Sequence, residues 1–259
     1  MSAAFDIAAL GRQGDELPFE VTEDALRAYA EATDDIPGGP VFALLPVWEA
    51  AGRASRSVAT DDVRPNVVHY EQDLRLHRPL AAGMQLRTRA TPIALLGRPN
   101  GSSLVTRTET RTTDGEVVNE QYVTEFFRGV EAPESVGERA PDHRLKVEGA
   151  PIAEISYPVA EDQSVRYAAA SGDHFAIHLD DEFARSVGLP GRILHGLWTM
   201  AQCARAQGDG LKLQSLSVQF RGMGVPEEEI TVTTTADGTV EATQGDNRLV
   251  RRGKAVIRE

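Results

Sequence analysis

Two segments far apart in the chain carry apolar residues at the spacing of a helix. In both segments these residues recur at i, i+3, i+4 and i+7. They are Leu44, Val47, Trp48 and Ala51 in the first segment, and Leu197, Met200, Ala201 and Ala204 in the second. This spacing puts the apolar side chains on one face of a helix. The pattern therefore predicts one long helix in each half of the chain, with its apolar face buried.

Strand-like sequence follows each of these two helices. Residues 67–80 correspond to residues 213–226, and residues 85–91 correspond to residues 229–236. Each half then closes with strands rich in Thr and Val, interrupted by short turn sequences. These turns are Asp114-Gly115, Asp237-Gly238 and Gly245-Asp246-Asn247, whose residue types tolerate the positive φ of tight hairpins. We predict about four or five antiparallel strands after each helix.

The similarity of the two halves extends to the segment before each long helix. Residues 22–35 align without gaps on residues 160–173. Identical pairs include Glu23 with Glu161, Asp24 with Asp162, Tyr29 with Tyr167, Ala30 with Ala168, and Asp35 with Asp173. Chance similarity between two helices is the simpler alternative, but the matching elements that follow weaken it. We infer a duplicated chain, in which each half reads helix, loop, long helix, then strands.

The two halves are joined by a segment of a different composition. Residues 129–151 are rich in Gly, Pro and Glu and have no apolar period, which is typical of a surface linker. We therefore divide the chain into an N-terminal half (1–128), this linker, and a C-terminal half (152–259). In an α+β fold, a sheet wrapped around one long helix fits each half. Two such units could pair their edge strands and so protect them.

Composition narrows the class of protein. The chain has 259 residues, of which 41% are hydrophobic and 25% charged, as in a soluble globular protein. Its net charge of −12 argues against binding to nucleic acid. The sequence contains no run of about 18 apolar residues, so we predict no membrane span. With the single cysteine Cys203 and no signal-peptide pattern at the N-terminus, we expect a reducing, cytoplasmic location.

The stretch SGDHFAIHLD, residues 171–180, concentrates groups that can transfer protons. Gly172 is suited to end the preceding helix, and Asp180 or Asp181 is suited to cap the next one. Asp173 and His178, on the turn between them, can hold one water molecule between a proton donor and a proton acceptor. The simpler alternative is that Asp173 only caps a helix. His174 and His178 have the spacing of a helical zinc pair, but no third ligand is evident, so we predict no metal.

The run from Tyr167 to Gly196 resembles the signature of the MaoC-like (R)-specific 2-enoyl-CoA hydratases, also called hydratase 2. The positions that match the family pattern are Tyr167, Ser171, Gly172, Asp173, Ile177, His178, Asp180, Ala184, Gly188, His195 and Gly196. The duplicated layout also resembles the double hot-dog members of this family, in which only the C-terminal half keeps the catalytic pair. The resemblance thus implies a double hot-dog fold of two tandem units.

The resemblance also implies a reaction. It is the reversible syn hydration of trans-2-enoyl-CoA to (3R)-hydroxyacyl-CoA, in which Asp173 and His178 activate water and the Gly196 N–H stabilises the thioester oxyanion. Ser171 and His195 are candidates for supporting roles. No cofactor is implied beyond the CoA or carrier protein on the substrate. A homodimer of double hot-dogs is one assembly that the fold permits.

Other functions are compatible with the same motif. A (3R)-hydroxyacyl-carrier-protein dehydratase of fatty-acid or polyketide synthesis and a hot-dog thioesterase are enzyme alternatives. A non-catalytic acyl-thioester-binding subunit is the alternative of another class. Phe175-Ala176 motivates this last alternative, because the family usually has Asn-Pro there. In the first half, Asp35 is followed by IPGGPVF without a histidine, so we expect no catalysis from that half.

Overall fold

The computed structural model describes residues 4–141, 149–208 and 210–258. Contacts between residues divide the chain into two compact units, and each is described here by itself. Unit 1 comprises Met1–Glu20, Ala43–Arg78 and Met84–Arg144, and unit 2 comprises Val21–Phe42, Pro79–Gly83 and Leu145–Glu259. Among the described residues, no helix is long and apolar enough to cross a membrane.

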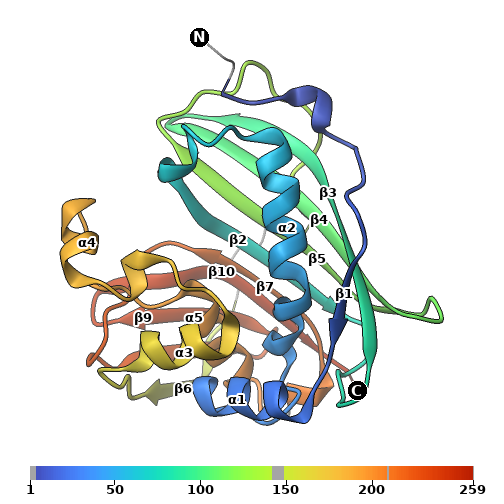
Figure 1. The fold of residues 1–259 in the computed structure, drawn as a ribbon. Helices are drawn as coiled ribbons and strands as arrows, with labels where there is room; N and C mark the ends of the chain where they lie inside the picture. Colours follow the sequence, from blue (N-terminus) through green and yellow to red (C-terminus); the bar gives the residue numbers. More distant parts are fainter. Residues whose placement is uncertain (1–3, 142–148, 209, 259) are drawn as a thin grey trace. The chain divides into compact units, whose positions relative to one another are not determined.

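Unit 1 is an antiparallel sheet packed on one long helix, α2 (Leu45–Val58), as Figure 1 shows. The strand order is β1-β3-β4-β5-β2, with every neighbouring pair antiparallel. The strands are β1 (Leu17–Glu20), β2 (Val67–Leu76), β3 (Gln85–Arg98), β4 (Gly101–Thr112) and β5 (Val117–Arg128). The predicted strands after the first helix are thus confirmed, and β1 precedes that helix.

The buried face of α2 is made of small apolar side chains. Ala50 and Ala54 pack against Ala90 of β3. Val47 and Ala51 of the same helix pack against Val123 of β5, which extends the contact across the sheet. Small side chains occupy little space between the helix and the strands. Because protein interiors are close-packed, the helix therefore lies close to the sheet. The prediction is confirmed for Val47 and Ala51, whereas Leu44 precedes the helix and Trp48 is only partly buried.

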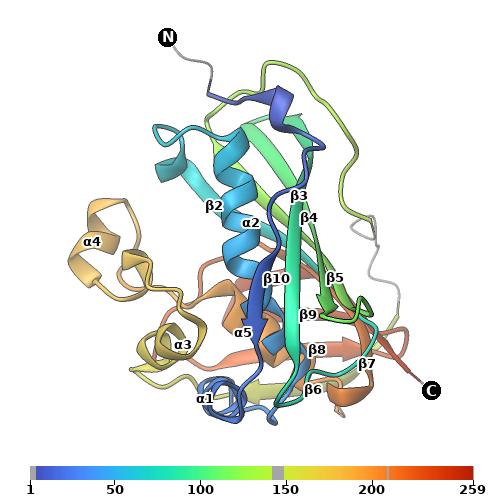
Figure 2. The ribbon, with the colours of Figure 1, turned by 45° about the vertical axis from the view of Figure 1, so that its right-hand side comes forward.

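Unit 2 repeats this arrangement with α5 (Gly196–Arg205) packed on β7, β9 and β10. The strand order is β7-β10-β9-β8-β6, again antiparallel throughout (Figure 2). The strands are β6 (Pro151–Tyr157), β7 (Leu213–Phe220), β8 (Ile230–Thr235), β9 (Thr239–Gln244) and β10 (Asn247–Ile257). The other helices are α1 (Glu23–Thr33), α3 (Gln163–Ser171) and α4 (Asp181–Ser186).

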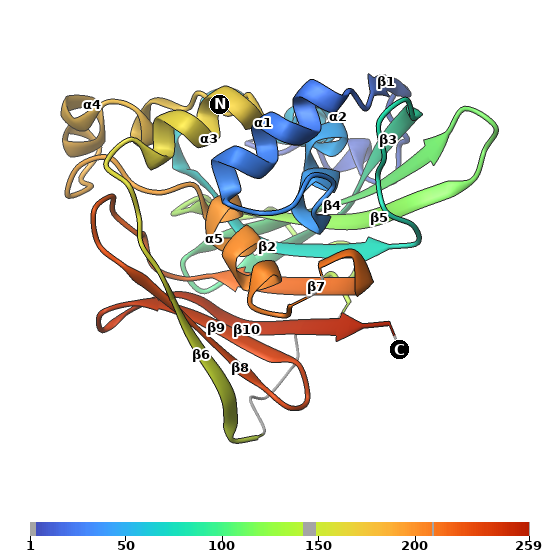
Figure 3. The same ribbon diagram turned by 90° about the horizontal axis from the view of Figure 1, so that it is seen from below.

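The two repeated helices of the sequence, α1 and α3, lie side by side in unit 2 (Figure 3). The hydroxyl groups of Tyr29 and Tyr167 are 3.1 Å apart in a buried hydrogen bond. Gln163 Nε2 also donates to the carbonyl of Ala32 at 2.7 Å. This division differs from the boundaries 1–128 and 152–259 expected from sequence, because these contacts group α1 with the C-terminal unit.

The expected linker, residues 129–151, is only partly separate from the folded units. Val136 pairs with Leu95 of β3 through two backbone hydrogen bonds of 2.8 and 2.9 Å. Ser135 Oγ accepts a hydrogen bond from the N–H of Gly97 at 2.8 Å. Residues 142–148 of the linker lie outside the described residues, and Pro151 already begins β6. The segment that the structure describes is therefore attached to the edge of unit 1.

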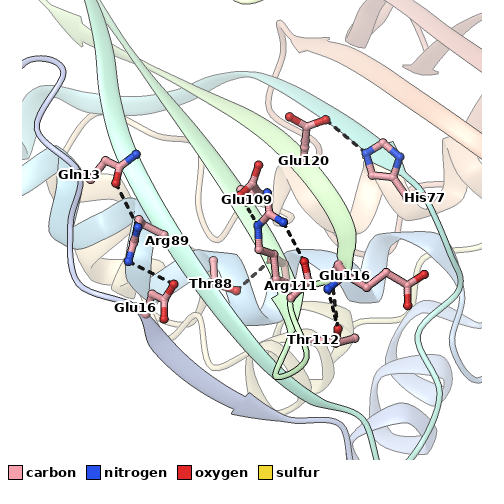
Figure 4. Close-up of polar contacts among 12 residues, drawn as sticks. Gln13, Glu16, His77, Thr88, Arg89, Glu109, Arg111, Thr112, Glu116 and Glu120 are labelled. Atoms are coloured by element: carbon pink, nitrogen blue, oxygen red, sulfur yellow. Dashed lines mark hydrogen bonds and ion pairs between the residues drawn. The ribbon is translucent and has the colours of Figure 1, made fainter.

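Charged side chains form paired networks on unit 1, as Figure 4 shows. Arg89 pairs with Glu16 at 3.1 Å, and Arg111 pairs with Glu109 at 2.6 Å. His77 Nε2 lies 3.2 Å from Glu120 Oε2. Partly exposed pairs of this kind contribute little to stability individually, about 0–1 kcal/mol each. His77 is thus an exposed residue paired with a neighbouring strand.

Candidate active site

The turn after α3 holds the Asp173 carboxylate in a defined position. The helix ends at Ser171 because Gly172 adopts the left-handed conformation, with φ of 78°. Ser171 Oγ then accepts a hydrogen bond from the Asp173 N–H at 3.2 Å. Asp173 Oδ1 accepts one from the Phe175 N–H at 3.2 Å, which is a local Asx turn. The described hydrogen bonds of the Asp173 carboxylate use Oδ1, so Oδ2 can accept a hydrogen bond from a ligand.

His178 lies at the end of a short 3-10 helix, Ala176–His178, and is buried. Its Nδ1 is 2.9 Å from the carbonyl oxygen of Ile193. A carbonyl can only accept, so Nδ1 carries the proton and Nε2 presents a lone pair. Burial lowers the pKa of His178, and the Ile193 carbonyl and the Asp173 carboxylate oppose this shift. The side chain is thereby kept in the neutral form, which can accept a proton.

His195 approaches both of these residues from the start of α5. Its Nε2 is 3.1 Å from the carbonyl oxygen of Asp173, and its ring stacks on His178 with centroids 3.8 Å apart. The three side chains bring acidic or imidazole atoms within 4.8 Å of one another. The structure thus brings together Asp173, His178 and His195, which are separated by up to 22 positions in the sequence.

Gly196 is the first residue of α5, directly after His195. The first N–H groups of a helix have no acceptor within it and carry the positive end of the helix dipole. A Cβ at this position would lie 3.1 Å from Cδ1 of Phe220, which is tighter than ordinary contact. Gly196 therefore combines an N–H suited to a developing negative charge with a close approach that a side chain would disturb.

The cluster is better suited to proton transfer than to metal binding. The rings of His178 and His195 are inclined by only 25°, so their in-plane lone pairs run side by side instead of converging on one ion. His174 is exposed on non-helical backbone, so the helical spacing that a zinc pair with His178 would need is not formed.

The unusual pair Phe175-Ala176 keeps the backbone shape of the turn. Phe175 has φ of −62° and ψ of 129°, the extended conformation that is favoured before a proline. Ala176 then begins the 3-10 helix that carries His178. The Phe175 side chain is half exposed, and its ring lies 6.4 Å from that of Phe183 and 6.5 Å from that of His178. The missing proline is therefore not needed for Asp173 to face His178.

The equivalent turn in the first repeat lacks an imidazole. Asp34, which aligns with Gly172, adopts the left-handed conformation with φ of 51°. Asp35 Oδ1 accepts a hydrogen bond from its neighbour Ile36 at 2.8 Å. Burial raises the pKa of Asp35, and the charge of Arg205 opposes that shift. This turn therefore holds a carboxylate without the histidine that a donor–acceptor pair requires.

Two partners of the cluster were not assigned a role from sequence. One is the backbone carbonyl of Ile193, which orients His178, and the other is the ring of Phe220, which packs on Gly196. Ile193 lies within the run from Tyr167 to Gly196 that resembles the family signature, but a sequence pattern cannot show that its carbonyl is the functional group. No sequence signal marks Phe220.

Comparison with known families identifies both halves of the chain. The MaoC like domain matches residues 144–258. The MFE-2 hydratase 2 N-terminal domain matches residues 20–129. A relative, enoyl-CoA hydratase ChsH3 of Mycobacterium tuberculosis, is 28% identical over 205 residues, covering 74% of this chain and 70% of that protein. Some other relatives are much longer, and the chain spans 30% of a multifunctional enzyme from Drosophila melanogaster.

Solved structures share the fold. A MaoC-like dehydratase from Phytophthora capsici superposes with a TM-score of 0.82 at 20% identity, covering 97% of this chain and 98% of that one. A Mycobacterium tuberculosis protein described as having a double hotdog fold superposes with a TM-score of 0.60 at 15% identity, covering 96% of each chain. The predicted α+β double hot-dog fold is confirmed.

Proposed function

Because the chain belongs to the MaoC-like dehydratase and hydratase 2 family, we propose that it reversibly hydrates trans-2-enoyl-CoA to (3R)-hydroxyacyl-CoA. The observation that carries this proposal is the meeting of Asp173 and His178 beside the first turn of α5. Relatives at 25–28% identity are named as enoyl-CoA hydratases, which supports a hydro-lyase activity. The R configuration and the CoA thioester are carried over from the family resemblance.

In the proposed reaction, Asp173 and His178 share one water molecule. The water oxygen bonds to C3 of the enoyl group as the pair accepts its proton, and a proton is delivered to C2 on the same face. The electrons of the double bond move toward the thioester oxygen and return when C2 is protonated. The neutral state of His178 and the fixed Asp173 carboxylate support this joint role, since each group must lie within hydrogen-bond reach of the water.

The charge that develops on the thioester oxygen needs donors that are already in position. Gly196 supplies a backbone N–H at the positive end of α5, and its lack of a side chain lets the Phe220 ring pack closely against it. Ser171 supports the pair through its bond to the Asp173 N–H. The chemistry requires no group beyond the thioester on the substrate.

The test is the loss of conjugated-thioester absorbance when purified protein meets crotonyl-CoA and a longer trans-2-enoyl-CoA. We expect hydration that falls by about 100-fold or more in Asp173→Asn and in His178→Ala. His174→Gln, which changes an exposed histidine of the same turn, is the matched control and should retain the rate. A well-folded protein with no activity on either thioester would contradict the proposal.

The same assay separates the alternatives. Faster turnover of a crotonyl carrier protein than of crotonyl-CoA would identify a carrier-protein dehydratase. Release of free thiol would identify a thioesterase. Binding without turnover, unchanged in Asp173→Asn, would identify a non-catalytic acyl-thioester-binding subunit.

A further inference from the structure

One buried histidine, His195, contacts both members of the candidate pair and also begins the helix that carries Gly196. Only 2% of its surface is exposed. Its Nε2 lies 3.1 Å from the carbonyl oxygen of Asp173, and its ring centroid is 3.8 Å from that of His178. Because His195 is the N-cap residue of α5, its backbone is continuous with the first N–H of that helix. This single residue therefore contacts Asp173 and His178 and directly precedes Gly196.

The contacts of His195 determine which nitrogen carries its proton. The Asp173 carbonyl can only accept, so Nε2 must be the donor. Nδ1 is buried and has no hydrogen-bond partner among the described residues. A second proton on Nδ1 would be a buried donor without an acceptor, which is unfavourable. Burial is the main cause that lowers the pKa of His195, and the neighbouring His178 and the exposed His174 lower it further. Asp173 acts in the opposite direction and raises this pKa. His195 is thus neutral, with its proton on Nε2.

The ring of His195 has a second aromatic neighbour. Tyr167 of α3 contacts it with ring centroids 4.8 Å apart. The Tyr167 hydroxyl in turn is hydrogen-bonded to the hydroxyl of Tyr29 on α1, at 3.1 Å. The buried imidazole therefore contacts two aromatic rings, those of Tyr167 and His178. Side chains locked in this way can hold reacting groups in a productive geometry.

We propose that His195 is a positioning residue, whose Nε2–H holds the Asp173 carbonyl while its ring supports the His178 imidazole. It keeps the Asp173 carboxylate, the His178 lone pair and the start of α5 in one arrangement. It has no proton to exchange with substrate, because its single N–H is engaged by Asp173. The inference deepens the proposed hydratase function and rests on it for its effect on rate.

Two substitutions separate the hydrogen bond from the ring contact. His195→Phe keeps a ring against His178 and removes the N–H, and His195→Gln keeps an amide N–H and removes the ring. We expect kcat for crotonyl-CoA to fall by about 10–100-fold in His195→Phe, with KM unchanged, because a small displacement of reacting groups is costly. We expect His195→Gln to recover part of this loss.

The pH profile is a second readout. His195→Phe keeps His178 buried, so the acid limb of kcat/KM should stay where it is in the wild type. His195→Gln admits water beside His178, so the acid limb should move to higher pH. The groups that face His178 are Asp173, the Ile193 carbonyl and His195 itself. A merely structural role for His195 would change the thermal unfolding temperature and leave the shape of this profile alone.

The controls distinguish failure of this inference from failure of the proposed function. His174→Gln should leave kcat, KM and the pH profile at wild-type values. A wild-type kcat in His195→Phe would overturn the inference. It would also be overturned if His195→Phe and His195→Gln lost the same amount of kcat and the same amount of thermal stability as each other. If the wild type does not hydrate enoyl thioesters, the proposed function is refuted. The inference about His195 can then still be tested by determining which of its ring nitrogens carries the proton. Long-range ¹H–¹⁵N spectra should then show its proton on Nε2, and a proton on Nδ1 would overturn the inference.

Discussion

Replacing Ala176 by proline should stabilise the protein, because the backbone already has the shape that proline requires. Phe175 has φ of −62° and ψ of 129°, which is allowed before proline, and Ala176 is the first residue of a 3-10 helix. The carbonyl of Ala176 accepts from Leu179 and Asp180, and a proline would keep that carbonyl. No hydrogen bond from the Ala176 N–H is present among the described residues.

The expected magnitude follows from the entropy of the unfolded chain. A proline at a compatible position contributes about 0.4–1 kcal/mol to the free energy of unfolding. For a chain of this size, about 1 kcal/mol moves Tm by about 2–4 °C, so the increase should be about 1–4 °C. Calorimetry or dye-monitored melting would measure it, and hydration of crotonyl-CoA would report whether the turn still presents Asp173 and His178.

Phe175→Pro is the matched control, one position earlier. It removes the N–H that donates to Asp173 Oδ1 at 3.2 Å, so we expect a loss of about 1 kcal/mol or more and a lower hydration rate. The reasoning is refuted if Ala176→Pro lowers Tm, since the turn would then have a conformation incompatible with proline. It is also refuted if the two prolines have the same effect.

Three further predictions concern the interior of unit 2. Gly196→Ala should cost about 1–3 kcal/mol, because its Cβ would lie 3.1 Å from the Phe220 ring; denaturant midpoints should show the loss, and Phe220→Leu should reduce it. Tyr29→Phe should cost about 1–3 kcal/mol by leaving the Tyr167 hydroxyl unpaired, and additive losses in the double Phe variant would contradict this. Because burial lowers the pKa of His178, the unfolded chain binds protons more readily. The free energy of unfolding should therefore decrease as pH falls from about 6.5 toward the pKa of His178 in the folded protein. Urea melts at several pH values would measure this decrease, which should be smaller in His178→Phe. An equal decrease in this variant and the wild type would contradict the prediction.

Much of the local structure could be predicted from the sequence because its causes act over a few residues. The apolar period of residues 197–204 predicted one buried face of α5, and the structure buries the whole stretch, including the polar Thr199 and Gln202. Gly172 ends α3 in the left-handed conformation, and Asp180 caps α4 by accepting from Glu182 and Phe183. Helical periodicity and capping depend on neighbours within one or two turns, so the sequence contains the information directly.

The grouping of elements depended on contacts between distant segments. The repeat between residues 22–35 and 160–173 was visible in the sequence, but its two helices pack against each other in one unit. That contact joins Tyr29 to Tyr167, which are 138 positions apart. The apolar pattern within either half cannot show that α1 packs on α3. The surface of α3 that α1 contacts is formed only when the chain has folded.

The candidate site divides in the same way. The sequence alone determined that Asp173 and His178 share one turn, since their spacing and the flanking helix signals are local. Only the tertiary structure decided that Ile193 orients His178, that His195 stacks beneath it, and that Phe220 closes on Gly196. These contacts form when the start of α5 is packed between the turn and β7. Their geometry is set by side-chain packing between separate elements, which no local pattern encodes.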